Sequence, residues 1–549
     1  MKIFDGYCQG RNGNLHLTKR NFLNFGGIFI KRLFWIVACA TFLMILTGAG
    51  YDEYTEKSTI FPSGIWQVPA RNNWDDPESR FSTHRMIETE HFAAFWEADF
   101  GECPSTAPGR LRFDIHAVLE EADRMWEFFH DELGFSVPGN TDRYRMHIYF
   151  FATTDWMAHG GGAGGRIGAM WLSPNTVQRM PFAVLAHEIG HAFQYVMRHG
   201  GNFAFRDNAP GSQGQAIWEI TSQFMLWQTY ERWLSFENWH LRYFLDTTHL
   251  GFLHEDQRYR APFVLEYWAY LHGPDIVSRL WREVRQGEDI IMVYQRMMEM
   301  TQAEFNDEIF NASRRFITWD IDRIREVAHP YINQHPSAFD YLGRGWYQII
   351  PSRAPQNYGY NGIRLDVPSA GTEISLEFRG VFDDLAFRNI RTENAGWRYG
   401  FVAMLRDGAR IYSDIFYDHD HGEATFIVPE DTQFLWLVVM GAPTTHWEHL
   451  WTDNPATNEQ WPYMIRLTNT ELHRTVRVTQ AIRYVDEPSN DEPADMYEED
   501  ASENFYEYTY TDDNENTSGI DWLLIAAIVS VSAGALALVI GTIVLRKKK

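Results

Sequence analysis

The sequence predicts an α+β protein, in which a region of mixed helices and strands is followed by an all-β region. Three observations support this prediction: a helical segment around His187 with one apolar face, further helical patterns after it, and a change of pattern from about Gly343. Beyond that residue, short alternating or apolar segments are separated by Gly, Pro, Asn and Asp. Many short strands with turn residues between them are typical of a β-sandwich or jelly roll.

The helical segment contains the motif His-Glu-x-x-His, formed by His187, Glu188 and His191. Two histidines four positions apart lie on one face of a helix, one turn from each other. Both imidazoles can then bind a single Zn²⁺. Glu188 is placed to act on a water molecule rather than to ligate the metal. A short motif of this kind can also arise by chance, so the interpretation requires a third ligand.

The third ligand is expected outside the motif helix. In the extended metzincin pattern a Gly and a His would stand where this chain has Gln194 and Met197, so that class is excluded. His199 is a weaker candidate because it precedes two glycines at which the helix should end. Glu219 is the better candidate, because it lies in a later segment with an apolar helical face. Two histidines and one glutamate form a catalytic zinc site with a position left for water.

The two segments together resemble a known family. The motif His187-Glu188-x-x-His191, followed by Ala-Ile-Trp-Glu219-Ile-Thr-Ser222-Gln223, is similar to the gluzincin metallopeptidases, the thermolysin-like branch of the zincins. It is most similar to an uncharacterised family of secreted bacterial proteins with this motif. The resemblance implies a zincin-like catalytic domain, Zn²⁺ on His187, His191 and Glu219, and Glu188 as general base. Ser222 and Gln223 would lie behind the ligands, with Gln223 orienting an imidazole where the peptidases have Asp.

A peptidase also needs a segment that binds the substrate and a residue that stabilises the oxyanion. An edge strand before the metal helix could pair with an extended peptide, and we assign this role to Gly168, Ala169 and Met170 in the segment 164–172. An ordinary glycine-rich connection is the alternative for that segment. The residue that stabilises the oxyanion is expected from the helices after Glu219. The candidates are Tyr267, Tyr270 and His272, each of which could instead be structural.

Composition and the two ends of the chain indicate where the protein acts. The formal net charge of −25 argues against a nucleic-acid partner. An apolar run at 33–46 after Lys31-Arg32 is typical of an export signal, with an uncleaved anchor as the alternative. A longer apolar run at 522–545, followed by Arg546-Lys-Lys-Lys549, predicts a transmembrane helix with a cytoplasmic basic tail. The expected organisation is a signal or anchor at 1–50, a leader at 51–85, a zincin-like domain at 86–335, a β-sandwich at 340–482, an acidic disordered stalk at 483–520, a membrane helix at 521–545 and a tail at 546–549.

These features predict a zinc-dependent hydrolase at the cell surface, with its catalytic and β domains outside a bacterial membrane. The substrate would be an extracellular peptide, protein or cell-wall component. Two alternatives remain open from the residues alone. One is a zincin-shaped binding or adhesion protein without turnover, and the other is a zinc amidase that acts on cell-wall glycopeptide.

Overall fold

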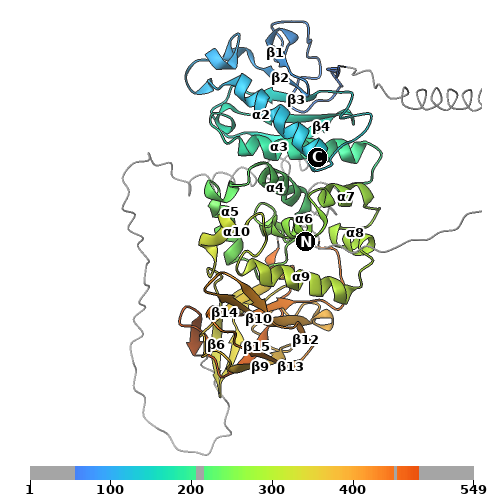
Figure 1. Cartoon of the computed structure of the whole chain (residues 1–549). Coiled ribbons are helices and arrows are strands. Elements are labelled where there is room, and N and C mark those ends of the chain that lie inside the picture. The colour runs from blue at the N-terminus through green and yellow to red at the C-terminus, as the bar shows by residue number, and fades with distance from the viewer. Residues whose placement is uncertain (1–55, 206–215, 450–453, 481–549) are drawn as a thin grey trace, which may run out of the picture. The chain divides into compact units, whose positions relative to one another are not determined.

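The computed structural model describes residues 56–205, 216–449 and 454–480 of the chain (Figure 1). By its contacts the chain divides into two units, 1–482 and 483–549, and all described residues belong to the first. The predicted export signal, acidic stalk and C-terminal membrane helix lie outside the described residues. Within those ranges, no helix is both long and apolar enough to cross a bilayer. The described part is a mixed α/β structure with several sheets, as the sequence predicts.

The first sheet holds the strands that precede the His-Glu-x-x-His motif. Its order is β1 (Met86–Glu88), β2 (Phe92–Trp96), β3 (Met146–Phe150), β5 (Ile167–Leu172) and β4 (Ala158–Ala163). The three central strands β2, β3 and β5 are mutually parallel. The two outer strands, β1 and β4, are antiparallel to their neighbours. Every residue of the central strands is buried, which is the pattern of strands covered on both faces.

Two different layers cover the faces of this sheet. The helices α2 (Ile115–Glu127) and α3 (Ala183–His199) pack on one face, and they share its hydrophobic core (Figure 1). The segment 56–85 covers the other face, where Ile65 and Phe81 are buried against alternate strand residues. The described part of the predicted leader therefore contributes to the hydrophobic cluster on this face of the first sheet.

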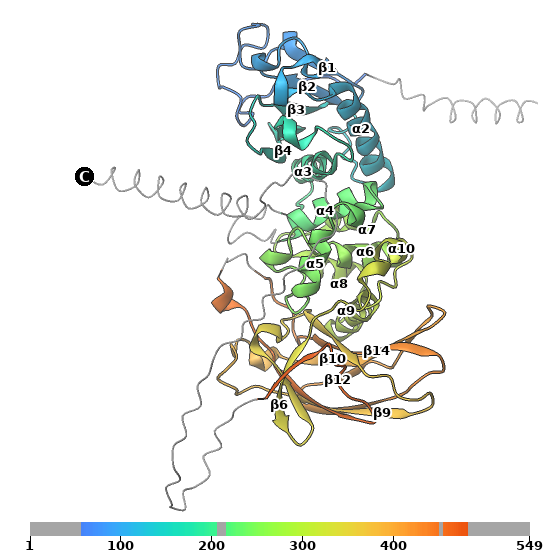
Figure 2. The ribbon, with the colours of Figure 1, turned by 90° about the vertical axis from the view of Figure 1, so that its left-hand side faces the viewer.

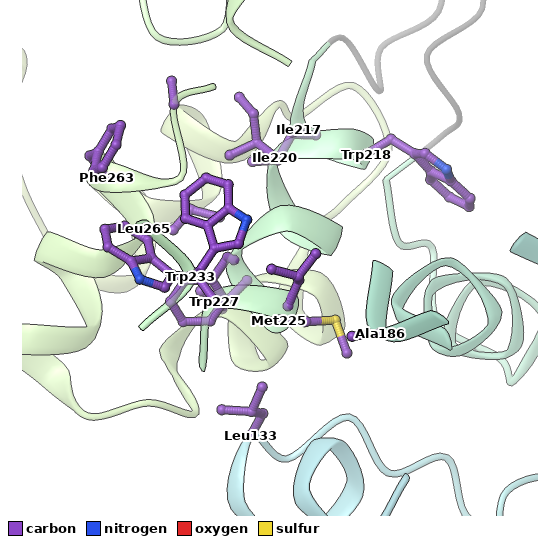
Figure 3. Close-up of a cluster of buried hydrophobic side chains, with 14 of the residues drawn as sticks. Leu133, Ala186, Ile217, Trp218, Ile220, Met225, Trp227, Trp233, Phe263 and Leu265 are labelled. Atoms are coloured by element: carbon purple, nitrogen blue, oxygen red, sulfur yellow. The ribbon is translucent and has the colours of Figure 1, made fainter. Parts of the chain in front are cut away.

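A group of helices follows the sheet and surrounds a second part of the same core. Figure 3 shows the large side chains packed around α4, among them Trp227, Trp233 and Phe263. Trp227 and Trp233 are fully buried, and their rings lie 5.3 Å apart. These helices are α4 (Ile217–Thr229), α5 (Asn238–Asp246), α6 (Phe263–His272), α7 (Ile276–Glu283), α8 (Ile290–Met297), α9 (Gln302–Phe316) and α10 (Arg325–Ala328).

The all-β region consists of two sheets that share one core. Side chains such as Phe378, Tyr399, Leu437 and Tyr463 meet between them and are fully buried. The outer face of one sheet packs against α9 (Figure 2). The strands of that sheet follow the order β11 (Arg410–Tyr412), β10 (Trp397–Leu405), β14 (Thr432–Gly441) and β8 (Tyr360–Leu365), and β12 (Phe416–Asp418) also pairs with β10. The strands of the other sheet follow the order β13 (His421–Ile427), β9 (Glu373–Gly380), β15 (Tyr463–Thr468), β7 (Trp346–Ile349), β6 (Ala338–Gly343) and β16 (Arg477–Gln480).

One carboxylate links the helices to the β region. Asp320 accepts hydrogen bonds from Arg315 at 2.9 Å, Arg325 at 2.8 Å and the Tyr412 hydroxyl at 2.8 Å. Burial alone would raise the pKa of Asp320, but Tyr412 and the arginines outweigh it and hold this pKa below its ordinary value. The contact between the two regions therefore includes a charged junction as well as apolar packing.

Candidate metal centre

The two helices that carry the predicted ligands approach each other very closely. A Cβ at Gly190 on α3 would overlap the Ser222 hydroxyl of α4 and lie 3.3 Å from the Ser222 Cα. The absence of a side chain at Gly190 therefore permits this approach. The Ser222 hydroxyl donates a hydrogen bond to the backbone carbonyl of His187, one turn away from Gly190. Ser222 thus lies behind the ligands, where the sequence resemblance predicts it.

The three predicted ligands converge across this contact. Oε2 of Glu219 lies 3.1 Å from Nε2 of His187 and 3.0 Å from Nε2 of His191. One donor atom from each residue falls within 4.8 Å of the others. Two imidazole nitrogens and one carboxylate oxygen at such separations are the donor set of a catalytic zinc site. The residues present therefore fit a Zn²⁺ ion.

Burial and mutual charge determine the electrostatics of this cluster. Burial alone would raise the pKa of Glu219, but the neighbouring His191 and His187 outweigh it and hold this pKa far below its ordinary value. Burial would lower the pKa of His191, but the Glu219 carboxylate raises it to about 9. Burial raises the pKa of Glu188 on the same helix, and the charge of Glu219 adds to the rise against the two histidines. Glu188 is thus a buried carboxyl next to the ligands, with an increased tendency to hold a proton.

The residue that orients a ligand imidazole is Gln194, not the predicted Gln223. Nδ1 of His191 lies 2.6 Å from Oε1 of Gln194, whose amide nitrogen donates to the Trp218 carbonyl at 2.7 Å. Gln194 is fully buried, so this arrangement fixes both the ring and the tautomer of His191. Gln223 instead donates to the backbone carbonyl of Tyr259 at 3.1 Å. The prediction for Gln223 was wrong because its side chain points to the loop before α6.

The predicted substrate edge strand was also placed one strand too far along the chain. Gly168, Ala169 and Met170 lie in β5, which pairs with β3 on one side and β4 on the other. Strand β4 is at the end of the sheet, and within the described residues it pairs with β5 alone. The glycine-rich stretch Ala158–Ala163, just before the predicted segment, is therefore itself the edge strand.

Strand β4 rests directly on α3, the helix that carries the His-Glu-x-x-His motif. A Cβ at Gly160 would overlap the Glu188 carbonyl and lie 2.6 Å from the His191 Cβ. A Cβ at Gly162 would overlap the ring of Tyr195, also on α3. These two glycines allow the backbone of the edge strand to lie against the helix that carries the ligands.

A tyrosine that the sequence analysis did not select faces the same cluster. Tyr259 lies in the loop before α6, and its ring centroid is 5.9 Å from that of His187. Burial raises the pKa of Tyr259, and the charges of Glu219 and Glu188 add to the rise, against Arg258. The phenol therefore keeps its proton next to the ligands and can donate a hydrogen bond. No periodic pattern marks this loop, which explains why the sequence analysis missed it.

The predicted oxyanion candidates lie elsewhere. Burial and the charge of Glu308 on α9 raise the pKa of Tyr267 to about 12, against Arg315 and Arg314 on the same helix. Nε2 of His272 lies 2.8 Å from the Tyr294 hydroxyl of α8. Tyr270 is 41% exposed beside Arg315. The helix α6 thus directs these side chains to α8, α9 and solvent, and the structure does not bring them to the candidate centre.

Two further ionisable side chains surround the cluster. Burial lowers the pKa of His159 on β4, with the nearby charge of His191 acting in the same direction. Burial raises the pKa of Glu237, before α5, against the opposing effect of the Trp233 hydrogen bond and the charge of His187. The cluster is therefore flanked by ionisable groups from the edge strand and from the helical region.

Comparison with known proteins places the chain in a family. Residues 52–474 match the family described as "Family of unknown function (DUF6055)". The chain belongs to this family. The match to DUF6055 includes the first sheet, all three candidate ligands and most of the β region.

Other comparisons are weaker. No curated protein matches the DUF6055 chain. Among solved structures, a functionally unknown conserved protein from Bacillus anthracis strain Ames, solved as a mutant, is similar with 12% identity and a TM-score of 0.25. That similarity covers 46% of this chain, which spans about half (50%) of the length of the other protein.

Proposed function

We propose that this protein is a zinc-dependent metallopeptidase of gluzincin type, with a zincin-like catalytic domain followed by a β-sandwich. The observation that supports it best is the convergence of His187, His191 and Glu219 from two helices. Their donor atoms are 3.0–3.1 Å apart, and Gln194 fixes the ring of His191 from behind. The buried carboxyl of Glu188 favours a catalytic centre over a purely structural one, since a structural ion needs no adjacent general base.

Each residue has a defined part in peptide hydrolysis. A bound Zn²⁺ supplies Lewis acidity, which acidifies water and polarises the scissile carbonyl. Glu188 takes the proton of the attacking water on its carboxylate and transfers it to the leaving amine. The Tyr259 hydroxyl donates a hydrogen bond to the carbonyl oxygen as negative charge develops there.

The edge strand provides a means of binding the substrate. An extended peptide can add to β4 through main-chain hydrogen bonds, next to the ligands on α3. Gly160 and Gly162 bring this strand close to the motif helix, so an added peptide would lie near the catalytic groups. We propose that the substrate is an extracellular peptide or protein, because the apolar segments at the two ends of the chain indicate export and anchoring in a membrane.

Replacement of the general base tests this function. The full chain and its Glu188→Gln variant are compared for bound zinc and for cleavage of an unfolded protein substrate. The proposal expects one equivalent of zinc at this site in both, with turnover in the parent only. Glu283→Gln, an exposed change on α7, serves as a matched control and should keep full activity.

Two results would overturn the assignment. Undiminished cleavage by Glu188→Gln would exclude Glu188 as the base. Zinc bound at the three ligands without cleavage of protein substrates, but with cleavage of cell-wall glycopeptide, would replace the peptidase with an amidase.

A further inference from the structure

A second cluster of potential ligands lies between the β1–β2 turn and the end of α2. Glu90 and His91 immediately precede β2, and Glu127 is the last residue of α2. Nε2 of His91 is 3.9 Å from Oε1 of Glu90 and 3.8 Å from Oε1 of Glu127. Donor atoms from the three residues all lie within 4.8 Å of one another. The cluster thus combines one imidazole nitrogen with two carboxylates.

The histidine of this cluster is held in a fixed orientation. His91 is 4% exposed, and its ring stacks on Trp126 at 3.8 Å with an interplanar angle of 5°. The backbone N–H of His91 donates to Asp123 on α2, and its carbonyl accepts from the Met146 N–H at 2.8 Å. Backbone and ring are therefore constrained independently of the two glutamates.

The Nε2 atom of this ring is buried and has no hydrogen-bond partner among the described residues. A buried polar atom without a partner destabilises the folded state. Distances of 3.8 and 3.9 Å to the carboxylates of Glu127 and Glu90 are too long for hydrogen bonds. They are close to those between ligands of one ion, because metal bonds of about 2.0–2.2 Å place neighbouring donors roughly 3–4 Å apart.

We propose that Glu90, His91 and Glu127 form a second metal site, which takes a divalent ion of the Zn²⁺ class. Imidazole nitrogen selects such ions over Ca²⁺ or Mg²⁺, which prefer oxygen ligands. The ion would give the buried Nε2 a partner and would link the start of β2 to the end of α2. The side chains of Glu90 and Glu127 are 50% and 59% exposed, so they can close on the ion without a change in the core.

A lysine lies against the other nitrogen of the His91 ring. Nζ of Lys57 is 2.5 Å from Nδ1 of His91 and 3.4 Å from the centroid of the Trp126 ring. A metal on Nε2 would place the ring proton on Nδ1, where it would face the N–H donors and the positive charge of the Lys57 ammonium. Removal of Lys57 should therefore strengthen metal binding.

The test counts zinc on the metal-stripped full chain, dialysed against chelator-buffered Zn²⁺. We expect two equivalents in the parent and one in Glu127→Ala. Glu120→Ala, an exposed change on the same helix, is the matched control and should keep both. Lys57→Met should bind the second equivalent at least tenfold more tightly. Since Glu127 is exposed, its variant should fold normally, and a circular-dichroism melt verifies this.

A double variant that lacks the first site distinguishes zinc bound at the two sites. With His187 and His191 both replaced by Ala, one equivalent should remain, and it should disappear when Glu127→Ala is added. If the full chain and Glu127→Ala bind zinc identically, the second site is refuted. If Lys57→Met leaves the affinity unchanged, the opposing effect of Lys57 is refuted. These counts do not depend on turnover, so failure of the proposed peptidase function would leave them unaffected.

Discussion

The close contact between α3 and α4 predicts that Gly190→Ala will weaken zinc binding. The added Cβ would overlap the Ser222 hydroxyl and lie 3.3 Å from the Ser222 Cα and Cβ, where ordinary contacts begin at 3.4 Å. The hydroxyl must move and α4 must retreat by a few tenths of an ångström. Overpacking of this kind costs about 1–3 kcal/mol. Alanine also favours a helix over glycine by about 1 kcal/mol, so stability alone is a poor readout.

Metal affinity is the sharper measurement because Glu219 is carried by the displaced helix. Glu219 lies three residues before Ser222, so a retreat of α4 draws its carboxylate away from His187 and His191. Metal–ligand distances tolerate only about 0.2 Å. If most of the overpacking energy appears in the bound state, zinc affinity should fall by about 10- to 100-fold, which corresponds to about 1.4–2.8 kcal/mol. Competition with a chromogenic chelator measures this change.

Two further variants decide whether the helix spacing is the cause. The double variant Gly190→Ala with Ser222→Ala lacks the overlapping hydroxyl. Its zinc affinity should therefore be close to that of Ser222→Ala alone. Gly161→Ala adds the same methyl group on β4, where its nearest neighbour is a Trp171 ring atom at 3.8 Å, and it should bind zinc normally. The reasoning is refuted if Gly190→Ala binds zinc within twofold of the parent.

Four other changes follow from the contacts of the centre and the fold. Glu219→Ala should lose the zinc of the first site, and a retained equivalent there in a metal count would disprove its role as ligand. Gln194→Ala should weaken zinc about 10- to 100-fold by releasing the His191 ring, which chelator competition can detect; unchanged affinity would contradict this. Tyr259→Phe should lower kcat about 100-fold with KM and zinc content preserved, and equal kcat would exclude the hydroxyl from catalysis. Asp320→Asn should lower the free energy of unfolding at pH 7. Because the folded-state pKa of Asp320 is depressed, this stabilisation is present above pH 3.8 and is lost as pH falls below it, so urea midpoints of parent and variant should converge in acid.

Local patterns identified the motif helix and the ligand helix correctly. The apolar face around His187 predicts the helix that the structure places at Ala183–His199. The face around Glu219 likewise predicts α4. Both predictions depend on apolar residues within a few helical turns of each other, and such short-range periodicity can be recognised in a single sequence. Long-range pairing of the two helices followed from the chemistry of the ligand set rather than from any local pattern.

The errors arise where tertiary contacts decide the structure. Strand β4 has the sequence Ala-His-Gly-Gly-Gly-Ala, which has little intrinsic strand propensity, and it is held by pairing with β5 and by contact with α3. Tyr259 lies next to the centre in a loop whose backbone accepts a hydrogen bond from Gln223. Gln194 stands where the metzincin pattern has Gly, and in the sequence it served only to exclude that class. Its contact with the His191 ring depends on how the two side chains lie in three dimensions. None of these contacts is encoded in a local repeat.

The glycines of the edge strand determine which mutations this protein can accept there. Positions 160 and 162 leave no room for a side chain against α3, whereas a Cβ at position 161 would make only an ordinary contact with the Trp171 ring at 3.8 Å. Mutational tolerance along β4 should therefore alternate, with nearly every replacement lost at the first two positions and small residues retained between them. If β4 binds substrate as proposed, a change of substrate preference would occur through residues on the side of the strand that faces away from α3, because the side against α3 has no freedom to vary.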